Sequence, residues 1–473
     1  MISFILNDKK YTTRLPPGAV TLDLLREEAG LTGTREGCRE GDCGACTVLL
    51  GTPQRQGIKY SAVNSCILPV GELHGRHLVT IEGVNQQEGL SPLQQVFVDE
   101  GASQCGFCTP GIIMSLTGYL LGTLDPDDIK AADFLAGNIC RCTGYVSISK
   151  SAKKVSGITG HSPAESCTSP EHLEWLVEKE VLPSYFLRIE EMLNTMDADE
   201  PEESVSGSSV TVAGGTDLFA LEAENLRNTD LLFLSRKEGM SGITALENRV
   251  LVGAGATVQD IIDSGVFRST GNLERSLKLI ASPQVRSRAT AGGNIVNASP
   301  IGDLSIIFLA LDAKLRITKD SEYREVQLKD FFRGYKVLDL SPGELLEHLE
   351  YIQPDSATFI NFEKIAMRQH LDIASVNTAA AFRVSGNSIV KADLSAGGVA
   401  PVPLYLERTS GVLSGMEIST ETAQLAVRTA RGEVSPIDDV RGSAEYKKLL
   451  LGNLIAAHFV ELFPRHIDRE KLL

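Results

Sequence analysis

Eight cysteines in the first third of the chain form two sets of four, and their spacing points to chemistry. The first set comprises Cys38, Cys43, Cys46 and Cys66, three of them in the stretch EGCREGDCGACTVLL. A C-x4-C-x2-C run with a distant fourth cysteine is the spacing of plant-type [2Fe–2S] ferredoxins. A structural zinc site prefers paired C-x2-C arms, so the wider gap favours an iron–sulfur cluster over zinc or free thiols.

The second set comprises Cys105, Cys108, Cys140 and Cys142, in the stretches QCGFCTPGIIMS and GNICRCTGY. Cys105 and Cys108 precede an apolar segment whose first turn is marked by a proline, which predicts a helix starting there. A helix N-terminus offers free N–H groups and a positive dipole end to nearby thiolates. We therefore predict a second cluster in helical surroundings, with buried free cysteines as the alternative.

The segments around the first set predict a β-grasp ferredoxin fold. The expected elements are a hairpin over 1–15 with its turn at Asn7-Asp8, a short amphipathic helix over 21–30 and a strand over 46–51. Glycines 37, 41 and 44 allow the cysteine loop to turn its N–H groups toward sulfur. The ninth cysteine, Cys167, lies in a polar stretch and is assigned no role.

Composition and charge limit the kinds of partner and the cellular location that we expect. The formal net charge of −16 disfavours a nucleic-acid partner, because phosphate binding needs a basic face. The N-terminus has no secretory signal pattern and no apolar run approaches the ~20 residues that span a bilayer. We therefore expect a cytoplasmic protein without membrane contact, in which structural disulfides are disfavoured. Residues 151–169 are predicted to be a linker, and the acidic stretch 197–209 a surface loop.

Two glycine pairs follow apolar, strand-like runs and are candidates for binding a nucleotide phosphate. They are Gly214-Gly215 in VTVAGGTDL and Gly292-Gly293 in ATAGGN. Neither a Rossmann fingerprint nor a P-loop is present, since Val258 stands where the third glycine of VGAGATV would be needed. A glycine turn can form an anion-binding nest, although a plain turn is the simpler interpretation of either pair.

The three cysteine stretches together resemble the iron–sulfur half of the molybdenum hydroxylases, the family that includes the xanthine dehydrogenases. The order continues with VAGGTDL, VGAGATVQDI and IASPQVRSRATAGGNIVNASPIGDLSIIFLALDA, which resemble the family's FAD domain. The stretch VRGSAEYKKLL resembles the small domain that follows it. The resemblance covers nearly the whole chain and is more specific to the family than to any substrate.

The resemblance implies an α+β multidomain architecture. Its parts are a β-grasp ferredoxin-like domain (1–76), a four-helix-bundle [2Fe–2S] domain (77–155), a linker (156–172), a two-part α+β FAD-binding domain of the vanillyl-alcohol-oxidase-like type (173–345) and a small α+β C-terminal flavoprotein domain (346–473).

It also implies which residues contact cofactors. For FAD these are Thr211, Val212, Ala213, Gly214, Gly215, Thr216, Asp217, Leu218, Ile280, Thr290, Gly293, Asn294, Ser299, Asp303, Leu346 and Lys364. Gln104 matches a residue that touches the pterin of the molybdenum cofactor, with a helix-cap role as the alternative. Asp303 could instead cap the helix that follows it. Several relatives have an aromatic residue where this chain has Ile280, which puts flavin stacking there in doubt.

In single-chain relatives a large molybdopterin domain follows, whereas this chain ends at Leu473. We therefore expect a split enzyme, with the molybdenum cofactor in a partner subunit and an assembly of two copies of each subunit. The resemblance implies oxidation of hypoxanthine and xanthine to urate, with electrons passing through the helical-domain cluster, the ferredoxin-like cluster and FAD to NAD. The alternatives are an aldehyde or other N-heterocycle hydroxylase, a stand-alone iron–sulfur flavoprotein and a zinc-stabilised scaffold.

Overall fold

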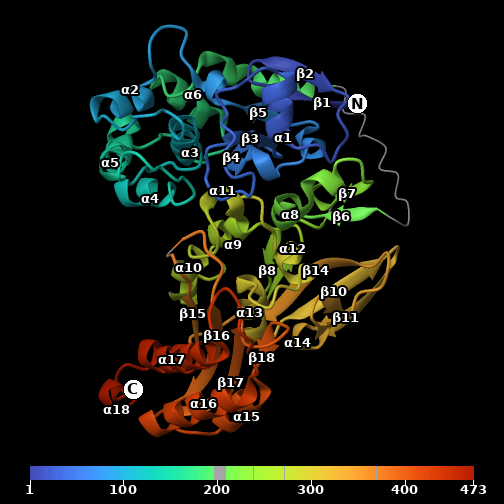
Figure 1. The fold of residues 1–473 in the computed structure, drawn as a ribbon, viewed down its shortest axis with the longest axis vertical. Coiled ribbons are helices and arrows are strands. Elements are labelled where there is room, and N and C mark those ends of the chain that lie inside the picture. Colours follow the sequence, from blue (N-terminus) through green and yellow to red (C-terminus); the bar gives the residue numbers. More distant parts are fainter. Residues whose placement is uncertain (197–208, 238, 271, 369, 473) are drawn as a thin grey trace. The chain divides into compact units, whose positions relative to one another are not determined.

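A computed structural model (Figure 1) describes residues 1–196, 209–237, 239–270, 272–368 and 370–472. The chain divides into two compact units, which are described separately. Unit 1 comprises Met1–Phe233 and Ser282–Arg288, and unit 2 comprises Leu234–Ala281 and Ala289–Leu473. The acidic loop predicted at 197–209 falls, except for its last residue, outside the described residues.

Unit 1 begins with a five-stranded sheet in the order β2-β1-β5-β3-β4. Its strands are β1 (Ile2–Leu6), β2 (Lys9–Thr13), β3 (Thr47–Pro53), β4 (Ile58–Asn64) and β5 (His77–Val79). The predicted hairpin is confirmed, because β1 and β2 pair antiparallel around Asn7, whose φ is 54°. β1 pairs parallel with β5, as a β-grasp sheet requires.

Both faces of this sheet are buried. Phe4 and Leu6 share a core with Leu24 and Leu25 of the π-helical turn Leu24–Glu28, which follows the short helix α1 (Thr21–Asp23). Ile5, between them, faces the helical part of the unit. Alternate residues of a strand point to opposite faces, so a strand buried on both sides must be apolar throughout. This second interface holds the two cysteine-bearing regions together.

The helical part of unit 1 packs around α3, which is buried along most of its length. Its helices are α2 (Pro92–Asp99), α3 (Thr109–Leu121), α4 (Asp128–Asp133), α5 (Val146–Thr159), α6 (Pro170–Glu178) and α7 (Ile189–Asn194). The predicted linker is shorter than expected, because α5 continues to Thr159 and α6 already begins at Pro170. The apolar positions of α5, among them Ile148, Ala152 and Val155, pack into the core, which a reading of composition alone overlooked.

A small βαβ unit completes unit 1. It consists of β6 (Val210–Val212), α8 (Thr216–Leu226) and β7 (Leu231–Phe233), with the two strands parallel. The short helix α11 (Pro283–Arg286) also belongs to unit 1, although the residues before and after segment 282–288 belong to unit 2. Its Val285 packs against a core that includes Cys46, Cys66 and Phe219.

Unit 2 contains two main sheets, in the orders β11-β10-β14-β9-β8 and β15-β16-β17-β18. Their strands are β8 (Ile243–Ala245), β9 (Arg249–Gly253), β10 (Lys314–Lys319), β11 (Glu322–Gln327), β14 (Leu345–Ile352), β15 (Thr358–Ile365), β16 (Val376–Ser385), β17 (Ser388–Gly397) and β18 (Leu404–Tyr405); β12 (Phe332–Gly334) and β13 (Val337–Leu338) form a separate pair. The helices are α9 (Val258–Ser264), α10 (Asn272–Leu277), α12 (Ala291–Val296), α13 (Asp303–Ala310), α14 (Leu328–Phe331), α15 (Glu407–Leu413), α16 (Thr420–Glu433), α17 (Ala444–Leu462) and α18 (Arg469–Leu472).

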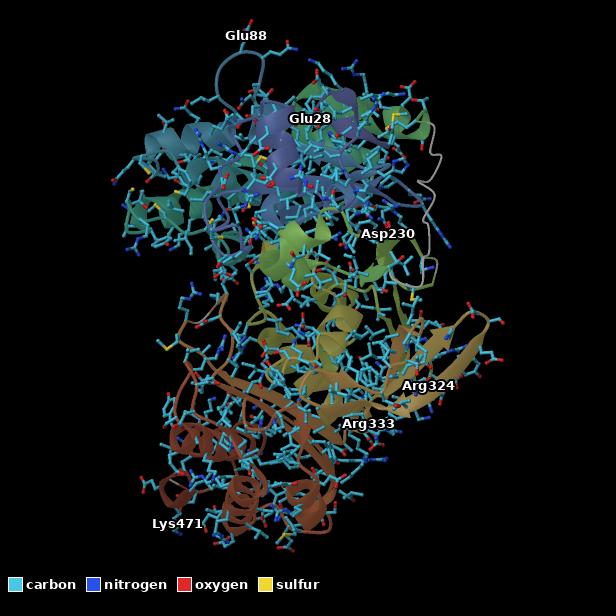
Figure 2. All side chains as sticks on the ribbon, turned by 45° about the vertical axis from the view of Figure 1, so that its right-hand side comes forward. Glu28, Glu88, Asp230, Arg324, Arg333 and Lys471 are labelled. Atoms are coloured by element: carbon cyan, nitrogen blue, oxygen red, sulfur yellow. The ribbon has the colours of Figure 1, made fainter. Side chains whose placement is uncertain are left out.

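Strand β16 links the two cores of unit 2. Ala380 and Phe382 face the core shared with α16 and α17, whereas Ala379 and Ala381 face the core shared with α13. At the other sheet, Arg324 of β11 is labelled in Figure 2. Its guanidinium hydrogen-bonds to Asp339 and Glu344, which precede β14. Over the described residues, the helices are all too short or too polar to cross a bilayer.

Candidate cofactor-binding sites

The four cysteines of the first set come together in unit 1. Their thiols lie close enough to shift one another's pKa, in the order Cys43–Cys38–Cys66–Cys46. Cys46 and Cys66 are each only 2% exposed, whereas Cys38 and Cys43 are half-buried. The cysteine loop and the short helix Ser65–Ile67, which carries Cys66, thus supply an inner and an outer pair of thiols.

Backbone N–H groups of the loop surround the outer pair. Those of Glu40, Asp42 and Cys43 donate to Cys38 Sγ at 3.4, 3.3 and 3.3 Å, and that of Cys38 donates to Cys43 Sγ at 3.4 Å. The hydrogen bonds from Cys43 and Cys66 hold the pKa of the Cys38 thiol far below its usual value. The loop therefore stabilises negative charge on sulfur, as a thiolate ligand needs.

The second set forms two pairs. Each pair joins one cysteine at the start of α3 to one cysteine in the turn before α5. The Cys142 thiol donates to Cys105 Sγ at 3.4 Å, and both residues are exposed. Cys108 and Cys140 are 9% and 6% exposed and also hydrogen-bond to each other. Cys108 is the N-cap residue of α3, which confirms the predicted helix start.

The inner pair of the second set has unequal acidities. Burial, and then the hydrogen bond with Cys140, raises the pKa of Cys108 to about 12. Burial would raise the pKa of Cys140 as well, but the hydroxyl and backbone N–H of Thr143 and the N–H of Cys142 lower it to about 7. The turn thus stabilises a thiolate at Cys140 before any metal is considered.

Both sets fit a [2Fe–2S] cluster. Such a cluster takes four thiolates, two on each iron, and each set offers four sulfurs of which every one lies against a neighbour. The cysteine loop also leaves room at the sulfurs, since a Cβ on Gly37 would lie 2.5 Å from Cys43 Sγ. In the described part of the chain, no three His, Cys, Asp or Glu side chains are placed to hold a single metal ion.

The two cysteine regions touch each other through backbone. The N–H of Ile139, next to Cys140, donates to the carbonyl of Cys43 at 3.0 Å, and the Asn138 side chain donates to the carbonyl of Gly44 at 3.2 Å. Gly44 has a φ of +68°, and a Cβ there would lie 2.2 Å from the carbonyl oxygen of Gly137. Only glycine permits this approach, so the spacing of the two sets is fixed locally.

A buried amide network supports this contact. Gln284 of α11 donates to Ser115 Oγ at 2.8 Å and to Asn138 Oδ1 at 3.1 Å. Neither Asn138 nor Gln284 was singled out from the sequence. Each is a polar residue beside apolar or glycine neighbours, and only the fold places one against the other although they lie 146 positions apart.

The first predicted flavin segment, Thr211–Leu218, forms the strand–turn–helix of the βαβ unit. β6 ends at Val212, and Gly215 occupies the N-cap position of α8 with a φ of 73°. The turn therefore has the geometry predicted for it, and free N–H groups begin there at the start of α8, which is kinked at Glu222. Arg288 donates to the Gly214 carbonyl at 3.0 Å.

The local structure at the second glycine pair differs from the prediction. Gly292 and Gly293 do not form a turn after a strand; they lie in the first turn of α12, where Thr290 is the N-cap residue and accepts from the Gly293 N–H at 3.0 Å. A Cβ on Gly292 would lie 2.6 Å from that of Ala254, so glycine is needed for close packing of the helix start. The N–H groups of Ala291 and Gly292 donate to the carbonyls of Ala256 and Ala254 at 2.9 and 2.8 Å, so this helix start has its first N–H groups already bonded and its contact with FAD stays a prediction.

Asp303 is part of a buried ion pair in unit 2. Its carboxylate accepts from Lys364 at 2.7 Å and from the Asn377 side chain at 2.6 Å, and Lys364 also donates to the Leu279 carbonyl at 3.3 Å. The alternative role as a helix cap is wrong, because Gly302 is the N-cap residue of α13. Two predicted flavin residues, Asp303 and Lys364, are thus in contact.

The other predicted residues have varied surroundings. Asn294 Oδ1 accepts from the N–H and hydroxyl of Ser305, and Ser299 Oγ accepts from the N–H of Ile301 at 3.5 Å. Ile280 and Leu346 are buried in the main core of unit 2. In unit 1, Gln104 is exposed and does not cap α3, so its proposed contact with a pterin stays a prediction.

Four protein-family models match the chain in the predicted order. They are described as a 2Fe-2S iron-sulfur cluster binding domain (residues 4–70), a [2Fe-2S] binding domain (80–153), a FAD binding domain in molybdopterin dehydrogenase (188–351) and a CO dehydrogenase flavoprotein C-terminal domain (362–462). The chain is therefore similar, domain by domain, to the iron–sulfur and flavin part of the molybdenum hydroxylases. The predicted α+β multidomain fold, with two [2Fe–2S] domains and a FAD domain, is confirmed.

Individual relatives carry several names. The chain is 31% identical to xanthine dehydrogenase/oxidase of Mus musculus over 84% of its own length and 34% of that protein. It is 27% identical to aldehyde oxidase 2 of Cavia porcellus over 98% of its own length and 40% of that protein. A carbon monoxide dehydrogenase structure from Hydrogenophaga pseudoflava matches 55% of this chain and 91% of that chain, with a TM-score of 0.52 and 26% identity. The chain thus spans between a third and two fifths of the length of these two curated relatives.

Proposed function

We propose that this chain is the electron-transfer subunit of a split molybdenum hydroxylase, a xanthine dehydrogenase that converts hypoxanthine and xanthine to urate in the cytoplasm. In this proposal it accepts electrons from a molybdenum centre in a partner subunit and delivers them to NAD. The observation that carries the proposal is the convergence of two complete four-cysteine sets in one unit. When bound, the clusters supply one-electron chemistry and FAD converts it to hydride transfer.

The residues of the chain would hold and tune these groups. We assign Cys38, Cys43, Cys46 and Cys66 to one cluster and Cys105, Cys108, Cys140 and Cys142 to the other. The N–H groups around Cys38 and the hydroxyl of Thr143 stabilise thiolate charge. The hydrogen bond from the Ile139 N–H to the Cys43 carbonyl holds the two cysteine sets next to each other.

In unit 1 the FAD assignment rests on the Gly214-Gly215 turn, and in unit 2 it rests on the Asp303–Lys364 pair. The glycine turn at the start of α8 offers N–H groups that suit phosphate oxygens. A carboxylate suits the hydroxyl groups of a ribose or ribityl chain. Lys364 holds the Asp303 carboxylate in one orientation, because it also donates to the backbone at Leu279.

The proposal of a separate molybdenum subunit is supported by a related enzyme in which one part of this chain corresponds to nearly a whole polypeptide. About half of this chain corresponds to 91% of one chain of the carbon monoxide dehydrogenase structure, so in that enzyme the corresponding region is a polypeptide by itself. We propose a molybdopterin-binding partner in an assembly of two copies of each subunit. The exposed pair Cys105 and Cys142, beside the exposed residues Phe107 and Tyr145, is the part of unit 1 that suits contact with it.

A second candidate is the same electron-transfer role with another substrate. The match to aldehyde oxidase 2 covers 98% of the chain, more than the match to xanthine dehydrogenase/oxidase of the mouse. An aldehyde or N-heterocycle hydroxylase would use the same clusters and flavin, because the substrate would bind to the partner.

The test is purification through an affinity tag on this chain under anaerobic conditions. We expect a large subunit to co-purify, about four iron atoms and one FAD per copy of this chain, and reduction of NAD by hypoxanthine. Activity with aldehydes alone would favour the second candidate. A preparation with clusters and flavin but no partner would point to a stand-alone flavoprotein, and zinc in place of iron would reject both proposals.

A further inference from the structure

An ion-pair cluster in unit 1 joins the ferredoxin-like region to the glycine turn of the βαβ unit. Glu72, whose side chain is completely buried, accepts from Arg76 at 2.7 Å and from Arg288 at 3.0 Å. Arg288, whose side chain is 11% exposed, also donates to the Gly214 carbonyl at 3.0 Å. One guanidinium therefore bridges a buried carboxylate and the turn.

The fork of the guanidinium explains why arginine occupies this position. Nη1 is bonded to Glu72 and Nη2 to Gly214, so two acceptors are held at a fixed spacing. The buried Nε has no partner among the described residues. Two arginines against one glutamate give the cluster a formal charge of +1 next to the turn.

This contact fixes the direction of a backbone N–H. In a trans peptide the carbonyl and the following N–H point in opposite directions. Because Arg288 holds the Gly214 carbonyl, the Gly215 N–H is directed away from the guanidinium, at the start of α8. The turn therefore has a defined donor and a nearby positive charge before any anion binds, which lowers the ordering cost of binding.

We propose that Arg288 is a positioning residue for FAD: it aligns the Gly214-Gly215 turn for the diphosphate by tying it to Glu72. This inference rests on the proposed function, because it assumes FAD at that turn. It adds a dependence that the cofactor assignment lacks, since Glu72 belongs to the ferredoxin-like region and not to the FAD domain. Retention of flavin then depends on a residue outside the flavin domain.

The experiment compares Arg288→Met with Arg76→Met in the full-length chain carrying its clusters. Arg76→Met also removes a partner of Glu72 but leaves the Gly214 contact, so it is the matched control. FAD content is measured after gel filtration, and FAD affinity by titration of the flavin-depleted protein. We expect Arg288→Met to bind FAD about ten- to a hundredfold more weakly, the loss typical of a hydrogen bond from a charged group, and Arg76→Met to stay within about twofold of wild type.

A stability readout separates positioning from general weakening of the fold. Both variants should lower the Tm of the flavin-free protein similarly, but only Arg288→Met should lose the rise in Tm caused by FAD. Arg288→Lys keeps the charge but not the fork, so its affinity should lie between wild type and Arg288→Met. If Arg288→Met does not fold, Arg288→Lys decides.

Wild-type affinity in Arg288→Met or, failing that, in Arg288→Lys would overturn the inference, as would an equal loss in Arg76→Met. If the wild-type chain itself binds no FAD, the proposed flavin function fails instead. The visible absorbance of the iron–sulfur clusters should be the same in all variants, because neither arginine is assigned to a cluster.

Discussion

The two cysteine regions hold the same number of thiols but expose them differently. In the ferredoxin-like loop, the outer pair is half-buried and Cys38 receives three backbone N–H bonds. In the helical region, Cys105 and Cys142 are both exposed, and the buried pair below them is held by a single turn. The first site is enclosed by its own loop, whereas the second leaves one side open, which is where a partner could receive or deliver electrons.

The largest expected effect comes from removing one ligand. Cys43→Ser should abolish the EPR signal of one reduced cluster and leave the other signal and FAD in place, because the two sets share no cysteine. Cys105→Ser should do the reverse. Cys167→Ser, a half-buried cysteine outside both sets, is the control. Survival of both signals in Cys43→Ser would show that the ligand assignment is wrong.

A substitution at the contact between the regions should be next in size. Gly44→Ala must accommodate both a φ of +68° and a Cβ 2.2 Å from the Gly137 carbonyl. We expect a loss of about 3 kcal/mol or more in the free energy of unfolding, measured by chemical denaturation. Gly75→Ala, with the same φ and open space around it, isolates the conformational cost of about 1 kcal/mol. Equal losses in the two variants would contradict a close contact.

Exposure itself can be tested with a chelator. In the isolated chain, iron should leave the helical-region cluster several-fold faster than the ferredoxin-like cluster, followed by the separate decay of the two EPR signals. Binding of the molybdenum subunit should slow that loss if the open side is its docking surface. Equal rates for the two clusters would remove the distinction between an enclosed and an open site.

The smallest effect is expected at the turn below the open side. The Tyr145 hydroxyl accepts from the Cys140 N–H at 3.0 Å. Tyr145→Phe removes this acceptor, and since the residue is 43% exposed, water can replace it at a cost of about 1 kcal/mol or less. The spectrum of the helical-region cluster should shift slightly while that of the other cluster stays unchanged. A change in both would imply coupling between the sites.

Local signals predicted the parts of the molecule that are set by neighbouring residues. Cysteine spacing gave both thiol sets, the turn at Asn7 gave the first hairpin, and Pro110 marked the start of α3. The sequence predicts a linker over 151–159, whereas the structure continues α5 through this segment, because its sparse apolar positions are buried only against other helices.

Contacts between residues far apart in the chain could not be predicted from the sequence. Nothing near Asp303 indicates that Lys364 and Asn377 will contact it, because they lie 61 and 74 positions away, on strands β15 and β16. Arg288 and Glu72 are 216 positions apart. The sequence predicts a turn at the second glycine pair. In the structure, Gly292 instead permits close packing against Ala254, a tertiary constraint that a strand-like run does not reveal.

The most direct test of the account is cofactor analysis of the anaerobically purified full-length chain, with EPR of the dithionite-reduced protein. The account predicts about four iron and four sulfide per chain, one FAD and two distinct [2Fe–2S] signals that disappear one at a time when each cysteine set is mutated. A colourless protein with zinc, or a single signal that depends on both sets, would contradict it.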